Sequence, residues 1–246
     1  MATKRAAVIV HDPTETPSMV GRRLRDHGYE LVEYVVSAEV GQAHSDMPFP
    51  DPADFELVVV MGAIHSVYDE ETIGSWIGRE LDFLRAADGA EVPVLGICFG
   101  AQALAAAHGG SVVRAERPQV GWHRIPAAPG MGTGPWMQWH YDRLEVPPAA
   151  TVLSVDEYGV QAFVLGRHLG LQFHPEVDPE HLQRWLDHGG DAELAKLGLD
   201  AEAIMDDART HADQGRTSAL VDWFLAEVAH LTDGEIGAPG DPTEAA

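Results

Sequence analysis

Cys98, the only cysteine among the 246 residues, stands among neighbours that are typical of a reactive thiol. It follows the apolar run 92–97, lies between Gly96 and Gly100, and precedes the Ala- and Leu-rich segment 101–107. This pattern predicts a strand, a sharp turn and a helix, with the thiol on the turn at the positive end of the helix. That position favours the thiolate, which is the form that attacks carbonyl carbons. The alternative for a single cysteine is a small buried hydrophobic residue, and the two glycines favour the nucleophile.

His174 and Glu176 form a second pair that could do chemistry, in the string His-Pro-Glu after the apolar run 169–173. Pro175 keeps His174 in extended geometry, and residues two apart in an extended segment point to the same side. Glu176 would orient the imidazole and stabilise its protonated form, while His174 takes the thiol proton and returns it to a leaving amine. Together with Cys98, the pair predicts a Cys-His-Glu triad that hydrolyses an amide.

Apolar runs that alternate with amphipathic stretches predict an α/β fold with a largely parallel central sheet. The expected strands are 6–10, 31–36, 57–61, 92–97 and 169–173, and the expected helices between them are 19–27, 73–86 and 101–107. The chemistry-bearing residues follow two of these strands directly.

The rest of the chain carries different signals. Residues 112–164 hold shorter apolar segments broken by Pro and Gly, which favours antiparallel strands and hairpins. An N-cap and a first-turn proline, Asp178 and Pro179, predict a helix from about residue 180. Further helices are expected at 201–213 and 217–231. We predict one domain over residues 1–231, followed by a loose acidic tail at 232–246.

Composition excludes several classes of partner and site. There are 16 Lys and Arg against 39 Asp and Glu, a formal net charge of -23, so nucleic acid and anionic membranes are not expected partners. The apolar run near the start is too short for a secretory signal or a membrane span, and we expect an intracellular, cytoplasmic protein. The 13 histidines are scattered and no His-Glu-x-x-His string occurs, so neither a metal site nor a cofactor is predicted.

Four motifs resemble those of the class I (triad-type) glutamine amidotransferases, and within them stand-alone proteins similar to the glutaminase domain of GMP synthase. Two are specific: the Gly-x-Cys-x-Gly-x-Gln elbow at 96–102 and the string Gln-Phe-His-Pro-Glu at 172–176. Residues 61–69 look like the family's Gly-Gly-Pro loop after the third strand, and residues 138–142 look like its substrate-side loop. The likeness runs from about Ala6 to about Leu231, nearly the whole chain.

The resemblance implies a flavodoxin-like sheet and adds roles to particular residues. Backbone N–H groups of Phe99 and of the Gly62-Ala63 turn would form the oxyanion hole. Gln102 and the loop with Trp139, His140 and Asp142 would hold the substrate's glutamyl part. This chain has Ala63-Ile64 where the family usually has Gly-Pro, and a Cβ at Ala63 adds strain if the turn requires a positive φ.

Three functions follow as hypotheses. In the first, Cys98 attacks the γ-amide of glutamine, a γ-glutamyl thioester forms, and the ammonia serves a separate synthetase subunit. In the second, the protein works alone as a γ-glutamyl hydrolase on a conjugated amine or peptide. The third, from another class, is a non-catalytic regulatory subunit that keeps the fold.

Overall fold

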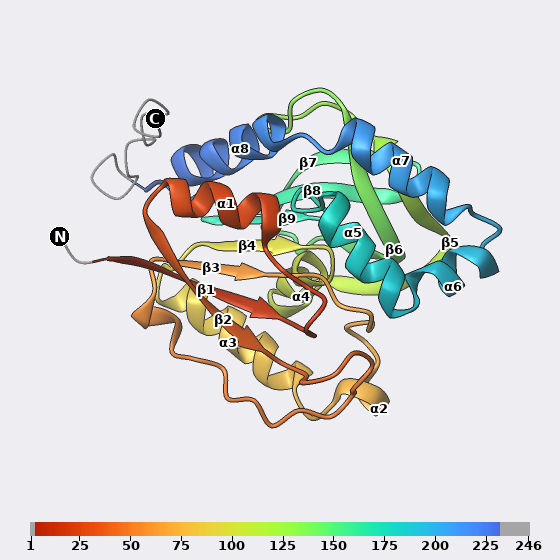
Figure 1. Ribbon diagram of the computed structural model, residues 1–246. Helices are drawn as coiled ribbons and strands as arrows, with labels where there is room; N and C mark the ends of the chain where they lie inside the picture. Colours follow the sequence, from red (N-terminus) through yellow and green to blue (C-terminus); the bar gives the residue numbers. More distant parts are fainter. Residues whose placement is uncertain (1–2, 232–246) are drawn as a thin grey trace.

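A seven-stranded sheet forms the centre of the computed structural model, which describes residues 3–231 (Figure 1). Its strand order is β2-β1-β3-β4-β9-β8-β7. The first five strands of that order run parallel, and β8 and β7 add to the β9 edge in antiparallel fashion. The strand bounds are β1 (Lys4–Val10), β2 (Tyr29–Val35), β3 (Leu57–Val60), β4 (Val94–Ile97), β7 (Thr151–Asp156), β8 (Gly159–Leu165) and β9 (His168–Leu171). The order of the parallel part is that of flavodoxin-like sheets, as predicted.

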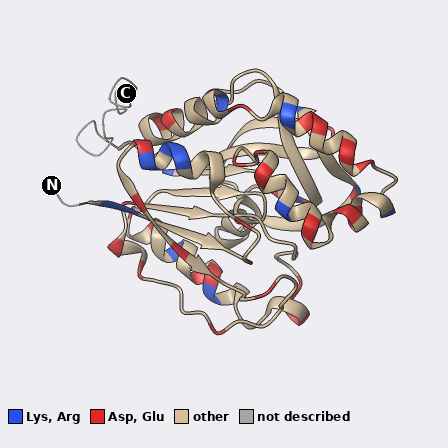
Figure 2. Cartoon of the chain, in the orientation of Figure 1, with Lys and Arg blue, Asp and Glu red and all other residues tan. Residues whose placement is uncertain are grey.

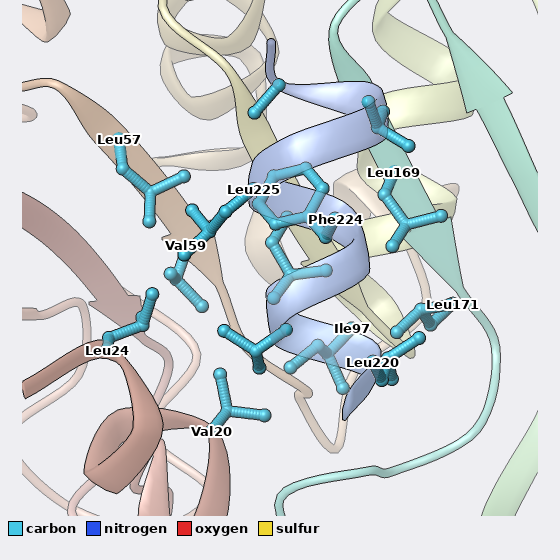
Figure 3. Packing of buried hydrophobic residues seen from close by; sticks show 14 of the residues in the cluster. Val20, Leu24, Leu57, Val59, Ile97, Leu169, Leu171, Leu220, Phe224 and Leu225 are labelled. Carbon is cyan, nitrogen blue, oxygen red and sulfur yellow. The ribbon is translucent and has the colours of Figure 1, made fainter. Parts of the chain in front are cut away.

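Helices cover both faces of this sheet because alternate residues of its buried strands point to opposite sides. Leu57 and Val59 of β3 pack with α1 (Ser18–Asp26), with α8 (Gln214–Trp223) and with the π-helical turn η3 (Phe224–Val228) that extends α8. Figure 3 shows Phe224 and Leu225 seated over the sheet residues on this side. Val58 and Val60 face the other layer, which contains α3 (Ile77–Gly89) and α4 (Phe99–Ala107).

A second, two-stranded sheet lies beside the C-terminal helices. The long strands β5 (Ser111–Arg124) and β6 (Pro135–Glu145) pair in antiparallel fashion, which confirms the prediction for this part of the chain. They pack against α5 (Pro179–Trp185) and α7 (Ala201–His211) through a third apolar cluster that includes Met137, Leu182 and Ile204. The turn η2 (Leu186–Gly190) and α6 (Asp191–Lys196) continue from α5. One backbone bond, from the N–H of His174 to the carbonyl of Met137 at 2.8 Å, ties this subsheet to the end of β9.

Most expected elements are present, with three differences. The predicted helix 73–86 is two helices, α2 (Glu70–Ile73) and α3, because the backbone at Trp76 leaves helical geometry with φ at -134°. The Pro- and Asp-rich segment 43–54, which contains no expected strand or helix, holds the 3₁₀ turn η1 (Pro52–Asp54) capped by Asp51. Helix α6 had no expected counterpart. The N-cap at Asp178 is confirmed, since its Oδ1 accepts from the backbone N–H of His181 at 2.9 Å, and the predicted tail at 232–246 lies outside the described residues.

Many of the charged residues lie on the outer helices and loops (Figure 2), whereas a few, such as Glu80, Asp142 and Glu176, are buried. Figure 2 shows acidic residues spread over the outer helices and loops, with basic residues lying among them. Within residues 3–231 there is no helix long and apolar enough to cross a membrane.

Phe224 carries the clearest stability prediction of the fold. Its ring is fully buried in the apolar cluster on the face of the sheet that α1 and α8 cover, so Phe224→Ala should lower the free energy of unfolding by about 3–5 kcal/mol through lost apolar contact and the cavity left behind. Urea unfolding measures the change. Val155→Ala, at a half-exposed position of β7, is the control and should stay within about 0.5 kcal/mol of wild type. Equal effects of the two substitutions would contradict the packing described.

Candidate active site

Cys98 lies on the predicted elbow between β4 and α4. Its backbone has φ at +51° and ψ at -106°, a conformation that L-residues rarely adopt. Neighbouring glycines allow it, because a Cβ on Gly96 would come within 2.6 Å of the carbonyl oxygen of Gly100, and a Cβ on Gly100 would collide with the carbonyl of Val60. The N–H of Cys98 donates to the carbonyl of Leu171 at 2.7 Å, which fixes the elbow to β9. The close packing holds the thiol at the carboxyl ends of the parallel strands.

The structure brings His174 and Glu176 to the same edge. His174 Nδ1 and Glu176 Oε1 are 2.7 Å apart, and both side chains are buried. Burial disfavours the charged imidazole, but the Glu176 carboxylate and the Cys98 thiol outweigh it and raise the pKa of His174 well above its ordinary value. His174 and Glu176 are therefore one hydrogen-bonded pair in which a protonated His174 is stabilised. Cys98 Sγ faces the carbonyl of Trp139 at 3.9 Å, and His174 Nε2 is buried without a hydrogen-bond partner. The triad of Cys98, His174 and Glu176 stays a prediction.

Aromatic and amide groups enclose this group. The Trp185 ring meets the His174 ring edge to face, with centroids 5.0 Å apart. It also meets the Trp139 ring at 5.6 Å. The side-chain amide of Gln172 donates towards Cys98 Sγ at 3.7 Å, and Gln102 donates to Gln172 at 3.1 Å. These contacts restrict the orientation of both the thiol and the imidazole.

The turn at Gly62 and Ala63 follows β3 and lies beside the elbow. A buried pair fixes it, because His11 Nδ1 donates to the carbonyl of Gly62 at 2.7 Å while its Nε2 lies 3.1 Å from both oxygens of Glu80. Burial opposes protonation of His11, and Glu80 and the Gly62 carbonyl reverse this and raise its pKa. Ala63 is not among the residues with positive φ, so its Cβ adds no strain of that kind to the turn.

Phe99 is the third residue expected at the oxyanion hole. As the first residue of α4, its backbone N–H is one of those that a helix leaves without an intrahelical partner. The next N–H, of Gly100, is taken by the carbonyl of Met61 at 3.1 Å. Phe99 and Ala63 both line the cavity above Cys98. The oxyanion-hole role of Gly62, Ala63 and Phe99 stays a prediction.

A cavity of about 450 Å³ opens over Cys98 and His174. Its far end is polar: Asp142 is buried, accepts from Ser66 Oγ at 2.5 Å and from Tyr68 Oη at 2.9 Å, and faces Arg114 Nη1 at 3.7 Å. Arg114 lies over the Tyr141 ring, 4.6 Å from its centroid. A carboxylate and a guanidinium side by side suit an amino acid's ammonium and carboxylate groups.

The four residues expected to bind substrate all line this cavity: Gln102, Trp139, His140 and Asp142. His140 is the most constrained of them. Its ring nitrogens lie 2.9 Å from the carbonyl of Asp142 and 3.0 Å from the Gln119 side chain, and burial lowers its pKa to about 4. A neutral His140 thus fixes the backbone that carries Asp142. Direct contact of these four residues with a substrate stays a prediction.

Sequence reasoning missed five residues of this site. Glu15, Arg114 and Trp185 line the cavity, and His11 and Glu80 support its turn. His11 could have been found, since it directly follows the buried strand β1 and polar residues at strand ends gather at one edge of the sheet. Trp185 and Arg114 come from an exposed-looking helix and a long hairpin, whose approach to the site depends on tertiary packing.

One cluster away from this site has the composition of a metal site. Ligand atoms of Asp88 at the end of α3, His108 at the end of α4 and His168 at the start of β9 lie within 4.8 Å of one another. However, His168 Nδ1 accepts from the backbone N–H of Val94 at 3.1 Å, so its proton is on Nε2, which faces Asp88 Oδ1 at 3.0 Å. A metal would need that nitrogen's lone pair. The contacts fit a hydrogen-bond network instead.

The comparisons with known proteins agree with this geometry. A model of the family "Glutamine amidotransferase class-I" matches residues 19–189. The chain belongs to this family. As a class I amidotransferase it is 31% identical over 193 residues to gamma-glutamyl peptidase 5 of Arabidopsis thaliana, a match that covers 70% of this chain and 76% of the peptidase.

Two further relatives differ in how much of their own length this chain matches. It is 32% identical over 186 residues to the glutamine-hydrolyzing GMP synthase of Thermomicrobium roseum, but spans only about a third of that protein's length, 32%. The crystal structure of a glutamine amidotransferase from Thermotoga maritima matches with a TM-score of 0.78 at 26% identity, over 92% of this chain and 99% of that one. This amidotransferase therefore shares most of its fold with the whole of that solved chain.

Glu80 gives a stability test of the turn's support. The His11–Glu80 pair is almost fully buried, with side chains 1% and 0% exposed, so Glu80→Ala leaves a charged or unpaired imidazole in the core. We expect a loss of about 3–5 kcal/mol in the free energy of unfolding, measured by urea denaturation. Glu70→Ala, at an exposed position of α2, is the matched control. A loss below about 1 kcal/mol for Glu80→Ala would mean that the pair does not hold the turn.

Proposed function

We propose that this protein hydrolyses γ-glutamyl amides through a thioester on Cys98, with His174 as acid and base and Glu176 as its orienting carboxylate. The single observation that supports the proposal is the buried His174–Glu176 pair, whose imidazole lines the same cavity as Cys98. Cys98 attacks the γ-carbonyl, His174 gives a proton to the leaving amine, and water activated by His174 then releases glutamate. The N–H groups of Phe99 and Ala63 would receive the oxyanion, each typically worth ~3 kcal/mol of barrier.

The proposal assigns the substrate's amino acid end to the polar end of the cavity. Asp142 would hold the α-ammonium group and Arg114 the α-carboxylate, with Gln102 and Trp139 along the chain between them and Cys98. Arg114 is a suitable counter-ion because its guanidinium is already positioned by the Tyr141 ring and by Asp142. The γ-carbonyl of a glutamyl group held in this way would reach Cys98.

The cavity favours a conjugated amine over glutamine itself. Cavities of this size hold drug-sized ligands, whereas glutamine has few atoms beyond the glutamyl part. The relative named gamma-glutamyl peptidase 5 supports a hydrolase that acts alone. The relatives named GMP synthase support the second candidate, a glutaminase whose ammonia serves a separate synthetase subunit. An intracellular location fits both candidates.

The test compares release of ammonia from free glutamine with release of amine from γ-glutamyl amides by the purified protein. We expect conjugates to be turned over with the higher kcat/KM, and His174→Ala to lower that value by about 10²- to 10⁴-fold. A thiol-directed glutamine analogue should label wild type and leave Cys98→Ala unlabelled. Absence of turnover and of labelling, with glutamine and with conjugates, would favour the non-catalytic subunit and sink the proposal.

Arg114 tests the assigned orientation. Arg114→Ala removes the guanidinium from the proposed carboxylate position, so KM for γ-glutamyl amides should rise by about tenfold or more with little change in kcat. A substrate whose α-carboxyl is blocked as an amide should show no such difference between wild type and variant. Steady-state kinetics with the two substrates measures both values. An equal rise in KM for the free and the blocked substrate would mean that Arg114 does not bind the α-carboxylate.

A further inference from the structure

Glu15 is a buried carboxyl group in the active-site cavity that none of the steps above uses. It lies in the connection between β1 and α1, and its side chain is 7% exposed. Its Oε2 is buried without a hydrogen-bond partner, and the nearest basic atom, His181 Nε2, is 3.7 Å away. Burial of an unbonded carboxyl group is costly, so its presence at the cavity wall points to a partner that comes with the substrate.

The carboxyl group lies close to the reacting atoms. A Cβ built on Gly62 would be 3.8 Å from Glu15 Oε2, 3.1 Å from His174 Cε1 and 3.9 Å from Cys98 Cβ. All three atoms are therefore within 4 Å of one point. Glu15 also lines the same cavity as Cys98 and His174.

The geometry also indicates which part of a substrate would meet Glu15. With the α-amino acid end at Asp142 and Arg114 and the γ-carbonyl at Cys98, the leaving amine must lie where His174 can protonate it. The wall beside His174 is formed by Glu15 from the loop after β1 and by Trp185 from α5. The departing nitrogen would pass this carboxyl group as it leaves.

We propose that Glu15 is the leaving-group residue of this enzyme: its carboxylic acid protonates the amine released from the γ-glutamyl substrate and holds it as an ammonium ion until it departs. The inference rests on the proposed function and adds the fate of the amine. A protonated amine has no lone pair, so it cannot attack the thioester and re-form the substrate.

Each bond and proton is accounted for in this step. The Cys98 Sγ–carbon bond forms, the carbon–nitrogen bond breaks, and the nitrogen takes the His174 Nε2 proton to leave as a neutral amine. Glu15 then gives its proton to the amine, producing a carboxylate and an ammonium ion. When the ammonium ion leaves, Glu15 regains a proton from solvent, and water attacks the thioester with His174 as base.

Electrostatics around Glu15 agree with a protonated resting state. Burial and the nearby Glu176 carboxylate raise the pKa of Glu15 to about 8, with Asp12 acting in the same sense and His174 and His11 opposing it. His181, the group on α5 that faces Glu15, is held neutral because burial lowers its pKa to about 4. Alkylamines titrate near ~10.4, like a lysine side chain. Proton transfer from this carboxylic acid to an alkylamine is therefore favourable.

The test uses two substrates that share the glutamyl part. γ-Glutamyl ethylamide releases a basic amine, whereas γ-glutamyl p-nitroanilide releases an amine that stays neutral and is a poor nucleophile. Glu15→Gln keeps the shape and removes the acid. We expect it to lower kcat/KM for the ethylamide by about tenfold or more, and to change the nitroanilide value by less than about threefold. Glu33→Gln, at an exposed position of β2, is the control for loss of one carboxylate.

A second measurement follows attack of the released amine on the thioester directly. Exchange of isotopically labelled ethylamine into unreacted substrate, relative to hydrolysis, should rise in Glu15→Gln, because the free amine can attack the thioester. Glu15→Asp keeps an acid, so its ratio of exchange to hydrolysis should lie between those of wild type and Glu15→Gln.

Three outcomes would overturn the inference. If Glu15→Gln lowered kcat/KM equally for both substrates, Glu15 would be a structural residue or a contact of the shared glutamyl part. If it lowered kcat/KM for neither, Glu15 would have no role in turnover. Failure of the wild type to cleave either substrate would instead overturn the proposed function, and this inference with it.

Discussion

The strand-to-helix elbow at Cys98 is the constraint on which the rest of the site depends. A cysteine with φ at +51° is unfavourable by itself, and it persists because the start of α4 is pressed against β3 and β4 at Gly96 and Gly100. A side chain at either glycine would move the start of α4, so the position of Cys98 depends on these backbone contacts. The predicted oxyanion hole, at the N–H of Phe99 and the turn after β3, would depend on the same contacts.

The site also depends on how its buried titratable groups are paired. Five titratable residues are buried beside the carboxyl edge of the sheet, and burial alone would neutralise each of them: His11, Glu15, His174 and Glu176 from segments that follow strands, and Glu80 from α3. Pairing decides the outcome: His11 and His174 each face a carboxylate and are favoured in the protonated form, while Glu15 has no hydrogen-bonding partner and is favoured as the neutral acid. One side of the cavity thus holds the Glu15 carboxyl group, the His174 ring and the Cys98 side chain within 4 Å of one point, and the cavity is also lined by the Asp142–Arg114 pair.

Much of this fold could be predicted from the sequence because its signals are local. The runs that became β1, β3, β4 and β9 are continuous and apolar, as strands buried on both faces must be, and turn residues separate them. Cys98, His174 and Glu176 could be proposed from the sequence because Cys98 directly follows one such strand and the other two come soon after another. The split between α2 and α3 was not predictable from periodicity, since Ile73, Trp76 and Ile77 keep helical spacing across the break and are all buried.

The remaining site residues depend on long-range packing. Trp185 reaches His174 only because α5 packs under the β5–β6 sheet, and Arg114 reaches Asp142 only through the register of that hairpin, in which the two residues are paired. Glu15 looks like one more acidic residue in a Pro- and Thr-rich loop. Its importance arises from burial beside Gly62, which no local pattern encodes.

The thioester on Cys98 is the central claim, and intact-mass spectrometry tests it most directly. The protein is mixed with γ-glutamyl p-nitroanilide, quenched in acid during turnover, and weighed. The account predicts a covalent γ-glutamyl adduct that maps to Cys98 and is absent from Cys98→Ala. Release of nitroaniline by wild type with no adduct on Cys98, or equal release by Cys98→Ala, would contradict it.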